Sequence, residues 1–218
     1  MRYRYDMQLH TLDTQLTHMG ELCEAAITKV TQALKDGNTE QAQVVIKEDE
    51  EIDQIEKDIE RLCLKLLLQQ QPVARDLRRI SAALKMITDM ERIGDQTSDI
   101  ADIIIAAGMS EAREIPVIGK MAEATSKMVN DSVLAYVNKD LELARKVMLA
   151  DDEVDKLFDQ TKQKLVKLIA EDHGNQGEKA IDLIMITKSL ERIGDHATNI
   201  AEWVEFSITG VHKGMAAV

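Results

Sequence analysis

The sequence has few of the residues that interrupt helices or support sheets. Its 218 residues include only two prolines and ten glycines, and aromatic residues make up 3%. Apolar residues nonetheless reach 44%, and Leu, Ile, Val, Met and Ala, which pack well between helices, dominate them. Long helices are therefore expected along the whole chain, with little material for strands or tight turns.

Cysteines and long apolar runs are also scarce. Cys23 and Cys63 stand at no metal-like spacing, and the opening MRYRYDMQLH lacks the apolar core of a signal peptide. We therefore expect a cytoplasmic protein. The longest apolar run, residues 103–107, is far shorter than the roughly 20 residues that span a bilayer, so any membrane role must act through a partner.

Positive charge is in deficit, because the net charge is −12. A surface of this sign repels the phosphates of nucleic acids and anionic lipid headgroups. Nucleic acid is therefore not an expected partner. Cations and basic protein surfaces are favoured instead, although acidic charge is also common in cytosolic proteins simply because it keeps them soluble.

The sequence is an internal repeat. ERIGDQTSDIA at residues 91–101 matches ERIGDHATNIA at residues 191–201 at seven of eleven positions. Further upstream, EDEEID at residues 48–53 lies over ADDEVD at residues 150–155, at an offset larger by two residues. We therefore expect two copies of one unit, residues 1–108 and 109–218, joined by a linker near residues 108–115.

Each unit is expected to contain three long helices. Gly37 ends the first helix and Asn38 caps the second, and Asp140 takes the same capping place in the second unit. Between Ile52 and Leu66 the apolar residues recur in alternating steps of three and four, as in coiled coils. The predicted fold class is all-α, with six long helices in two tandem three-helix bundles that lie end to end, each with its own core.

Two helix breaks place acidic residues side by side. Gln71-Pro72 interrupts the first unit and residues 173–175 interrupt the second, so the last two helices of each unit should form an antiparallel hairpin. Residues equidistant from such a turn lie level, because both helices rise about 1.5 Å per residue. The residues that become neighbours are Asp49, Asp53, Glu91 and Asp95 in the first unit and Asp151, Asp155, Glu191 and Asp195 in the second.

Four carboxylates at one place favour a cation site. They repel one another by roughly 1 kcal/mol per pair at 4 Å in water, and a bound Mg²⁺, Mn²⁺, Ca²⁺, Zn²⁺ or iron ion would relieve the repulsion. Asp99 extends the first acidic row, whereas Asn199 stands at that place in the second, so the two sites should differ in charge. The alternative is ordinary solvated acids, partly paired with lysines such as Lys57.

Other residues near these acids have simpler expected roles. Gly94 and its repeat equivalent Gly194 should mark a close approach of another helix, because glycine inside a helix otherwise destabilises it. Arg92 and Arg192 are expected to reach acids on a neighbouring helix. His196 is a further candidate metal ligand, although the first unit has no histidine at that place.

The segment QPVARDLRRI at residues 71–80, the duplicated ERIGD and the two acidic segments together resemble the PhoU family, the accessory proteins of bacterial phosphate-specific transport. The resemblance covers nearly the whole chain. It implies two three-helix bundles, a homodimer, and metal ions or multinuclear clusters held by the acidic motifs. It also implies a negative regulator that links the ATPase subunit of the phosphate transporter to a phosphate-sensing histidine kinase.

Three functions are therefore compared. The first is a non-enzymatic cytoplasmic adaptor of the phosphate-starvation response. The second is a di-metal carboxylate enzyme, whose sites typically add Glu-x-x-His pairs that do not accompany the acidic motifs here. The third is a purely structural helical scaffold whose acids serve solubility. The sequence favours the first.

Overall fold

The computed structural model describes residues 2–69, 73–108, 116–171 and 173–212. Within these ranges the chain forms six helices and no strand, so the predicted all-α class is confirmed. The helices are α1 (Arg2–Asp36), α2 (Thr39–Gln69), α3 (Ala74–Ala107), α4 (Pro116–Asn138), α5 (Leu141–Glu171) and α6 (Gly177–Thr209). None of the described helices has a stretch long and apolar enough to cross a bilayer.

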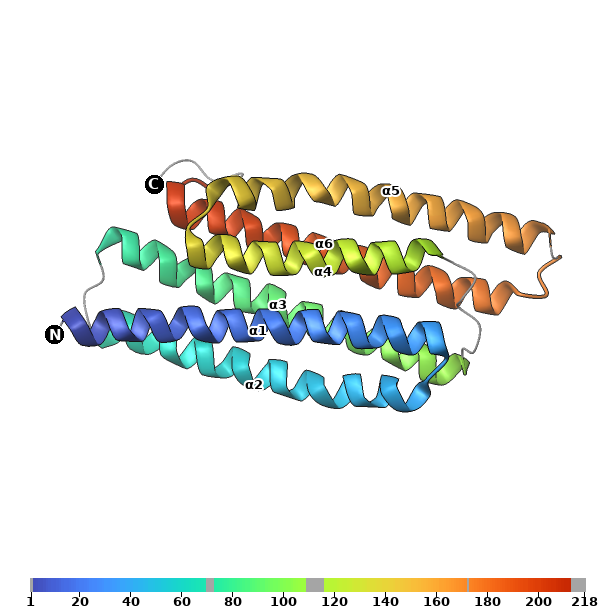
Figure 1. Cartoon of the computed structure of the whole chain (residues 1–218), viewed down its shortest axis with the longest axis horizontal. Helices are drawn as coiled ribbons and strands as arrows, with labels where there is room; N and C mark the ends of the chain where they lie inside the picture. The colour runs from blue at the N-terminus through green and yellow to red at the C-terminus, as the bar shows by residue number, and fades with distance from the viewer. Residues whose placement is uncertain (1, 70–72, 109–115, 172, 213–218) are drawn as a thin grey trace.

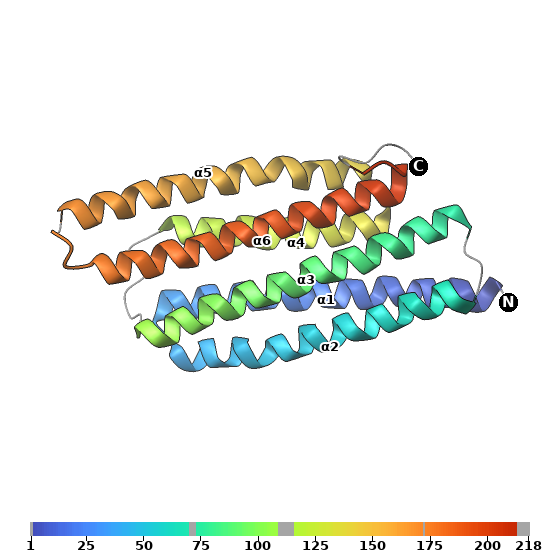
Figure 2. The ribbon, with the colours of Figure 1, turned by 180° about the vertical axis from the view of Figure 1, so that it is seen from behind.

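The six helices form two three-helix bundles, α1–α3 and α4–α6, as the repeat predicted. The bundles lie side by side, however, and the expected end-to-end arrangement is wrong (Figure 1, Figure 2). In both views α3 lies along α6 and α1 along α4. The end of α2 and the beginning of α3 therefore lie at the opposite end of the molecule from the end of α5 and the beginning of α6.

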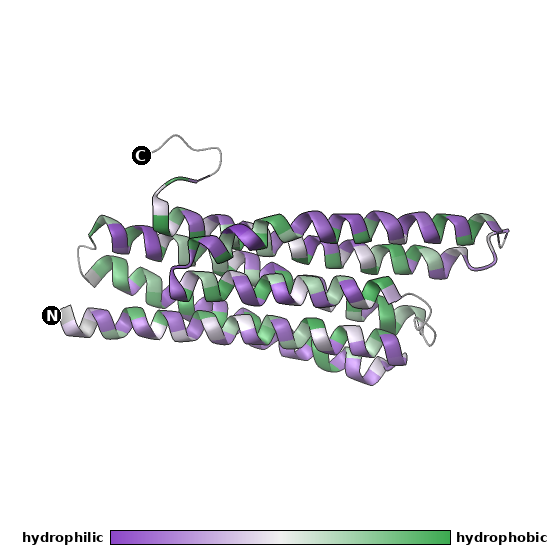
Figure 3. Cartoon of the chain, turned by 45° about the horizontal axis from the view of Figure 1, so that its top comes forward, coloured by the Kyte–Doolittle hydropathy of each residue, from purple (hydrophilic) through white to green (hydrophobic). Residues whose placement is uncertain are grey.

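The side-by-side packing follows from the width of the buried surface on α3 and α6. Each of these helices packs against helices of both bundles, and α3 buries neighbouring positions such as Ala82 and Ala83 together with Met86 and Ile87. A single continuous apolar cluster runs through both bundles, where the repeat had favoured two cores. Figure 3 shows the matching alternation of hydrophobic and hydrophilic residues along the helices.

The helix boundaries follow the capping residues. The main-chain N–H of Gln41 donates to Asn38 Oδ1 at 3.0 Å, and that of Leu143 donates to Asp140 Oδ1 at 2.9 Å, so both predicted N-caps are confirmed. Before the first cap, Gly37 adopts a left-handed φ of 64°, which lets the chain leave α1 without steric cost.

The breaks between helices agree with the sequence wherever they are described. His173 and Gly174 have φ values of 53° and 85° and turn the chain between α5 and α6. Gly108 ends α3 in the left-handed conformation, and Pro116 is the first residue of α4, as expected. The predicted Gln71-Pro72 break and most of the predicted linker lie outside the described residues.

Candidate metal centres

The two hairpins bring the acidic rows level, and a glycine marks each meeting point. A Cβ atom added to Gly94 of α3 would lie 2.3 Å from Asp49 Oδ1 of α2, so a larger residue would displace this carboxylate. At the equivalent place, a Cβ on Gly194 of α6 would lie 3.4 Å from Asp151 Oδ1 of α5, which is an ordinary contact. The predicted register is confirmed in both hairpins, and the predicted close approach is confirmed at Gly94.

The first acidic cluster consists of Asp49, Asp53, Glu91, Asp95 and Asp99. The first four are half-buried, and Asp99 is exposed. Ser98 Oγ donates to Asp49 Oδ2 at 2.9 Å, whereas the buried Asp49 Oδ1 has no hydrogen-bond partner among the described residues. A buried carboxylate oxygen without a donor is costly, so this atom is a natural ligand for a cation.

The carboxylates of the first cluster perturb one another. Burial raises the pKa of Asp49, the hydrogen bond from Ser98 opposes the rise, and the charges of Asp53, Asp95 and Asp99 add to it. Burial likewise raises the pKa of Glu91, and Asp95 on the same helix adds to the effect. Acids from both helices therefore form one electrostatic unit, which a positive ion would stabilise.

Glu56 also interacts with the first acidic cluster, although it was not predicted from the sequence. Burial raises the pKa of this α2 carboxyl, with contributions from Glu60 and Asp53, and its charge in turn raises the pKa of Glu91 across the hairpin. Its position three residues after Asp53 places it on the same helix face, a signal that was present in the sequence. Glu56 escaped notice because the second copy carries Phe158 there.

Basic residues offset part of the negative charge in the first cluster. Lys57 lies 3.8 Å from Asp53, as the sequence suggested. Arg92 forms its direct ion pairs with Glu91 and Asp95 of its own helix, at 3.5 and 3.0 Å, because the (i, i+3) spacing brings Asp95 within reach on the same face. Its charge also opposes the rise in the pKa of Glu56 on α2, so the expected reach to an acid of a neighbouring helix is electrostatic and not a direct ion pair.

The second acidic cluster consists of Asp151, Asp155, Glu191 and Asp195, so it has fewer carboxylates than the first cluster. Asp151 and Glu191 are half-buried, and the other two are exposed. Burial raises the pKa of Asp151 to about 6, and the charges of Asp195 and Asp155 contribute. Lys188 forms an ion pair with Glu191, whereas the first cluster has Thr88 at the position of Lys188 and its Glu91 pairs with Arg92.

His196 contacts the other bundle instead of the second cluster. Its Nδ1 lies 2.9 Å from Asp89 Oδ1 of α3, and Asn199 Nδ2 donates to the same oxygen at 3.1 Å. Arg192 also acts across this interface, because its charge opposes the rise in the pKa of Asp99 on α3. The polar edge of the α3–α6 contact therefore fixes the two bundles relative to each other.

The donor atoms of both clusters suit an oxygen-preferring cation, but their present arrangement is open. In the described part of the chain, no group of three or more His, Cys, Asp or Glu residues gathers closely enough to hold a metal ion. The carboxylates stand on adjacent helix faces and perturb one another's pKa values, so rotation about side-chain bonds is what would bring them onto one ion. The residues fit such an ion in the chemistry of their donor atoms, whereas a fit in position requires these side-chain rotations.

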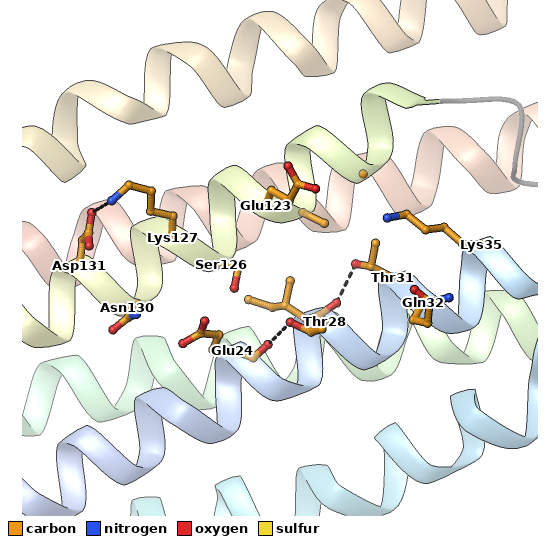
Figure 4. A pocket seen from close by; sticks show the side chains of 13 residues that line it. Glu24, Thr28, Thr31, Gln32, Lys35, Glu123, Ser126, Lys127, Asn130 and Asp131 are labelled. Carbon is orange, nitrogen blue, oxygen red and sulfur yellow. Dashed lines mark hydrogen bonds and ion pairs between the residues drawn. The ribbon is translucent and has the colours of Figure 1, made fainter.

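A groove between α1 and α4 lies apart from these clusters. It has a volume of about 420 Å³, and Figure 4 shows polar side chains from both helices along its walls. Lys127 pairs with Asp131 on α4, while Glu24, Glu123 and Lys35 add charges of both signs. Because the charges are mixed, the groove favours no particular class of ligand.

Comparisons with known proteins agree on one family. The family model of the PhoU domain matches residues 16–104 and again residues 118–204. The chain is 35% identical to a phosphate-specific transport system accessory protein PhoU homolog of Clostridium acetobutylicum, covering 94% of each chain. It is 38% identical to the homolog of the same name from Zymomonas mobilis, covering 94% of this chain and 87% of the relative.

A solved structure gives the same result. The crystal structure of PhoU from Pseudomonas aeruginosa superposes with a TM-score of 0.87 at 33% identity, over 95% of this chain and the whole of that one. The duplicated match of the family model coincides with the two bundles, and relatives align from end to end. The chain therefore belongs to the PhoU family.

Proposed function

We propose that this protein is a non-enzymatic negative regulator of the phosphate-starvation response, associated with a phosphate-specific transport system. The observation that carries the proposal is the similarity over nearly the whole chain to relatives that are named accessory proteins of that system. Both bundles and both acidic segments fall within the regions that the family model matches, so the proposal draws on the whole of each unit.

The proposed partners are the ATPase subunit of the phosphate transporter and a phosphate-sensing histidine kinase. In this scheme the protein works in the cytoplasm as a homodimer and holds the kinase in its non-signalling state while phosphate is plentiful. The net charge of −12 supports basic partner surfaces, because complementary charge raises association rates and disfavours partners of like charge.

The acidic clusters are proposed to bind iron, manganese, magnesium or zinc and so to fix the hairpins. The support is the buried Asp49 Oδ1 without a donor among the described residues, together with the raised pKa values of Asp49 and Asp151, to which burial contributes most and repulsion by the neighbouring carboxylates adds. A cation between α2 and α3, or between α5 and α6, would remove this repulsion and make each hairpin more rigid. A rigid hairpin presents a defined surface to a partner.

A genetic experiment tests the regulatory role. Deletion of the gene should give constitutive expression of phosphate-starvation genes in phosphate-rich medium, and the wild-type gene supplied in trans should restore repression. Normal repression in the deletion strain would contradict the proposal. A strain carrying the paired substitution Asp53→Asn and Asp155→Asn then reports whether the acidic clusters take part.

A binding experiment tests the metal sites independently of signalling. Calorimetric titration with Mn²⁺, Mg²⁺, Zn²⁺ and iron should show binding to the wild type and weaker binding to the variant with Asp53→Asn and Asp155→Asn. The matched control is Glu50→Gln with Asp152→Asn, two exposed acids on the same helices. Negligible binding by all three proteins would favour the structural scaffold instead.

A further inference from the structure

A cavity at one end of the molecule gathers positive charge from both bundles. The beginnings of α1 and α3 and the ends of α4 and α6 meet at this end (Figure 1). Between them lies a cavity of about 530 Å³ whose lining includes three arginines of α3 and a lysine that follows α4. These residues are Arg75, Arg78, Arg79 and Lys139. In a chain with a net charge of −12, four cations around one cavity are unusual.

Most of this positive charge is not neutralised. Arg79 is the exception, since it pairs with Asp13 of α1 and lies 5.7 Å from the centre of the Tyr136 ring. Among the described residues, no carboxylate lies within ion-pairing distance of Arg75, Arg78 or Lys139, although Asp6 and Asp76 also line the cavity. Three cations outside ion-pairing distance of these carboxylates therefore exceed the two acids of the lining, an arrangement that an anion would stabilise.

The fold holds two of the arginines in place. Arg78 lies along the left-handed Gly210 that ends α6, where an added Cβ would be 3.5 Å from its Cδ, and its Nε is buried without a hydrogen-bond partner among the described residues. The Tyr136 hydroxyl donates to the main-chain oxygen of Arg79 at 2.9 Å and so ties the end of α4 to α3. Packing and hydrogen bonds with neighbouring helices therefore hold Arg78 and Arg79 in defined positions.

Two further features favour an oxyanion. Val73, the N-cap residue of α3, makes no side-chain capping bond, and the first amide of α3 that donates to its carbonyl oxygen is that of Asp76, so the main-chain amides of Ala74 and Arg75 remain available. The Tyr5 hydroxyl is buried and unpartnered in the described structure, and Asp76, Arg79 and Asp6 of the cavity wall all influence its pKa. Guanidinium groups and free amides together match the oxygens of a phosphoryl group.

We infer that this cavity binds a small phosphorylated anion through Arg75, Arg78 and Lys139. Both bundles contribute to the site, so its occupancy ties the start of α3 to the end of α4. The phosphoryl group belongs either to inorganic phosphate or to a nucleotide, which the cavity is large enough to admit in part. The inference rests on the geometry of the cavity and does not depend on the proposed regulatory function.

Calorimetric titration of the full chain with inorganic phosphate and, separately, with ATP tests the inference. A chelator is present throughout, so that metal bound to the acidic clusters cannot recruit the anion. The variant Arg78→Gln with Lys139→Gln should bind at least about tenfold more weakly, since hydrogen bonds that involve a charged group are stronger than those between neutral groups. The control Lys164→Gln with Lys167→Gln removes the same charge from exposed positions of α5.

Each outcome decides the question. If the wild type and the control variant bind inorganic phosphate and the cavity variant does not, the cavity is an inorganic phosphate site. If the same difference appears only with ATP, the cavity is a nucleotide site. Absence of binding to the wild type at millimolar concentrations of both, or equal weakening in the two variants, overturns the inference. Circular dichroism and the thermal midpoint of each variant confirm that it is folded, and Lys139→Gln alone repeats the test if the double variant is not.

Discussion

Replacement of Asp151 by asparagine should stabilise the metal-free protein at neutral pH. Burial and the charges of Asp195 and Asp155 raise the pKa of this carboxyl from 3.8 to about 6. The folded state therefore binds a proton more tightly than the unfolded state, so the stability present below pH 4 is lost as the pH rises through about 6. Asparagine keeps the shape of the side chain and removes the charge.

The magnitude follows from the size of the shift. A rise of about 2 pKa units corresponds to about 3 kcal/mol if the site were dry, because each unit is worth about 1.4 kcal/mol. Asp151 is only half-buried, so screening by solvent reduces the expected gain to about 1–2 kcal/mol. For a chain of this length that gain raises the thermal midpoint by about 2–8 °C.

The assay compares thermal midpoints of the wild type and the Asp151→Asn variant with chelator present, at pH 4 and at pH 7.5. The difference between the two proteins should be small at the lower pH and reach its full size at the higher one. Asp152→Asn, a substitution of the exposed neighbour, is the control and should show no such dependence. A variant that is less stable than the wild type at pH 7.5, or equally shifted at both pH values, would refute the electrostatic reasoning.

Three further predictions concern packing and capping. Gly194→Ala should raise the free energy of unfolding by about 0.5–1 kcal/mol, because the new methyl group meets only ordinary contacts. Gly94→Ala should give no such gain and should weaken metal binding, because its methyl group would displace the Asp49 carboxylate, which lies 2.3 Å from the added Cβ. Equal effects of the two substitutions on the denaturation midpoint would contradict this reasoning. Asn38→Ala should destabilise the protein by about 1 kcal/mol in urea titrations while Asn38→Ser does not, since serine retains a capping oxygen. Burial raises the pKa of Cys23 and of Cys63 to about 12. A thiol reagent should therefore label these cysteines only as the protein unfolds. Rapid stoichiometric labelling of the native protein would argue against their burial.

Much of the fold could be predicted because its signals are local. The spacing of apolar residues predicted helices, and Asn38, Asp140 and Pro116 marked where three of them begin. The arrangement of the two bundles could not be predicted in the same way. A seam of apolar residues identifies one buried face, but α3 and α6 bury residues against helices of both bundles, and small residues such as Ala82 and Ala83 carry no strong periodic signal.

The acidic clusters were predictable because an antiparallel hairpin has a simple register. Equal rise in both helices places Asp49 opposite Gly94 once the turn is known, and the second copy confirms the rule at Asp151 and Gly194. Comparison of the two copies identifies only residues that recur. Glu56, whose charge raises the pKa of Glu91 in the first cluster, has no acidic counterpart in the second copy and so could not be found in this way.

The cavity lined by Arg75, Arg78, Arg79 and Lys139 could not be predicted from the sequence, for a different reason. Its arginines lie in QPVARDLRRI, a segment whose role as a family motif was plain, but Lys139 comes from the other bundle and follows a different helix. Only the side-by-side packing brings these helix ends together. Sites that depend on the contact between repeats are therefore not visible from either repeat alone.

The two acidic clusters share a backbone frame but differ in charge. Relative to the first cluster, the second replaces Glu56 with Phe158 and Asp99 with Asn199, and it gains Lys188 beside Glu191. One difference acts in the opposite direction, because Asp159 stands where the first cluster has Lys57 beside Asp53. Because the attraction of a cation grows with the number of unneutralised carboxylates, the first cluster should bind the more highly charged ion or the larger number of ions. If the proposed metal sites exist, we therefore expect metal to hold the hairpin of α2 and α3 closed at concentrations that leave the hairpin of α5 and α6 open.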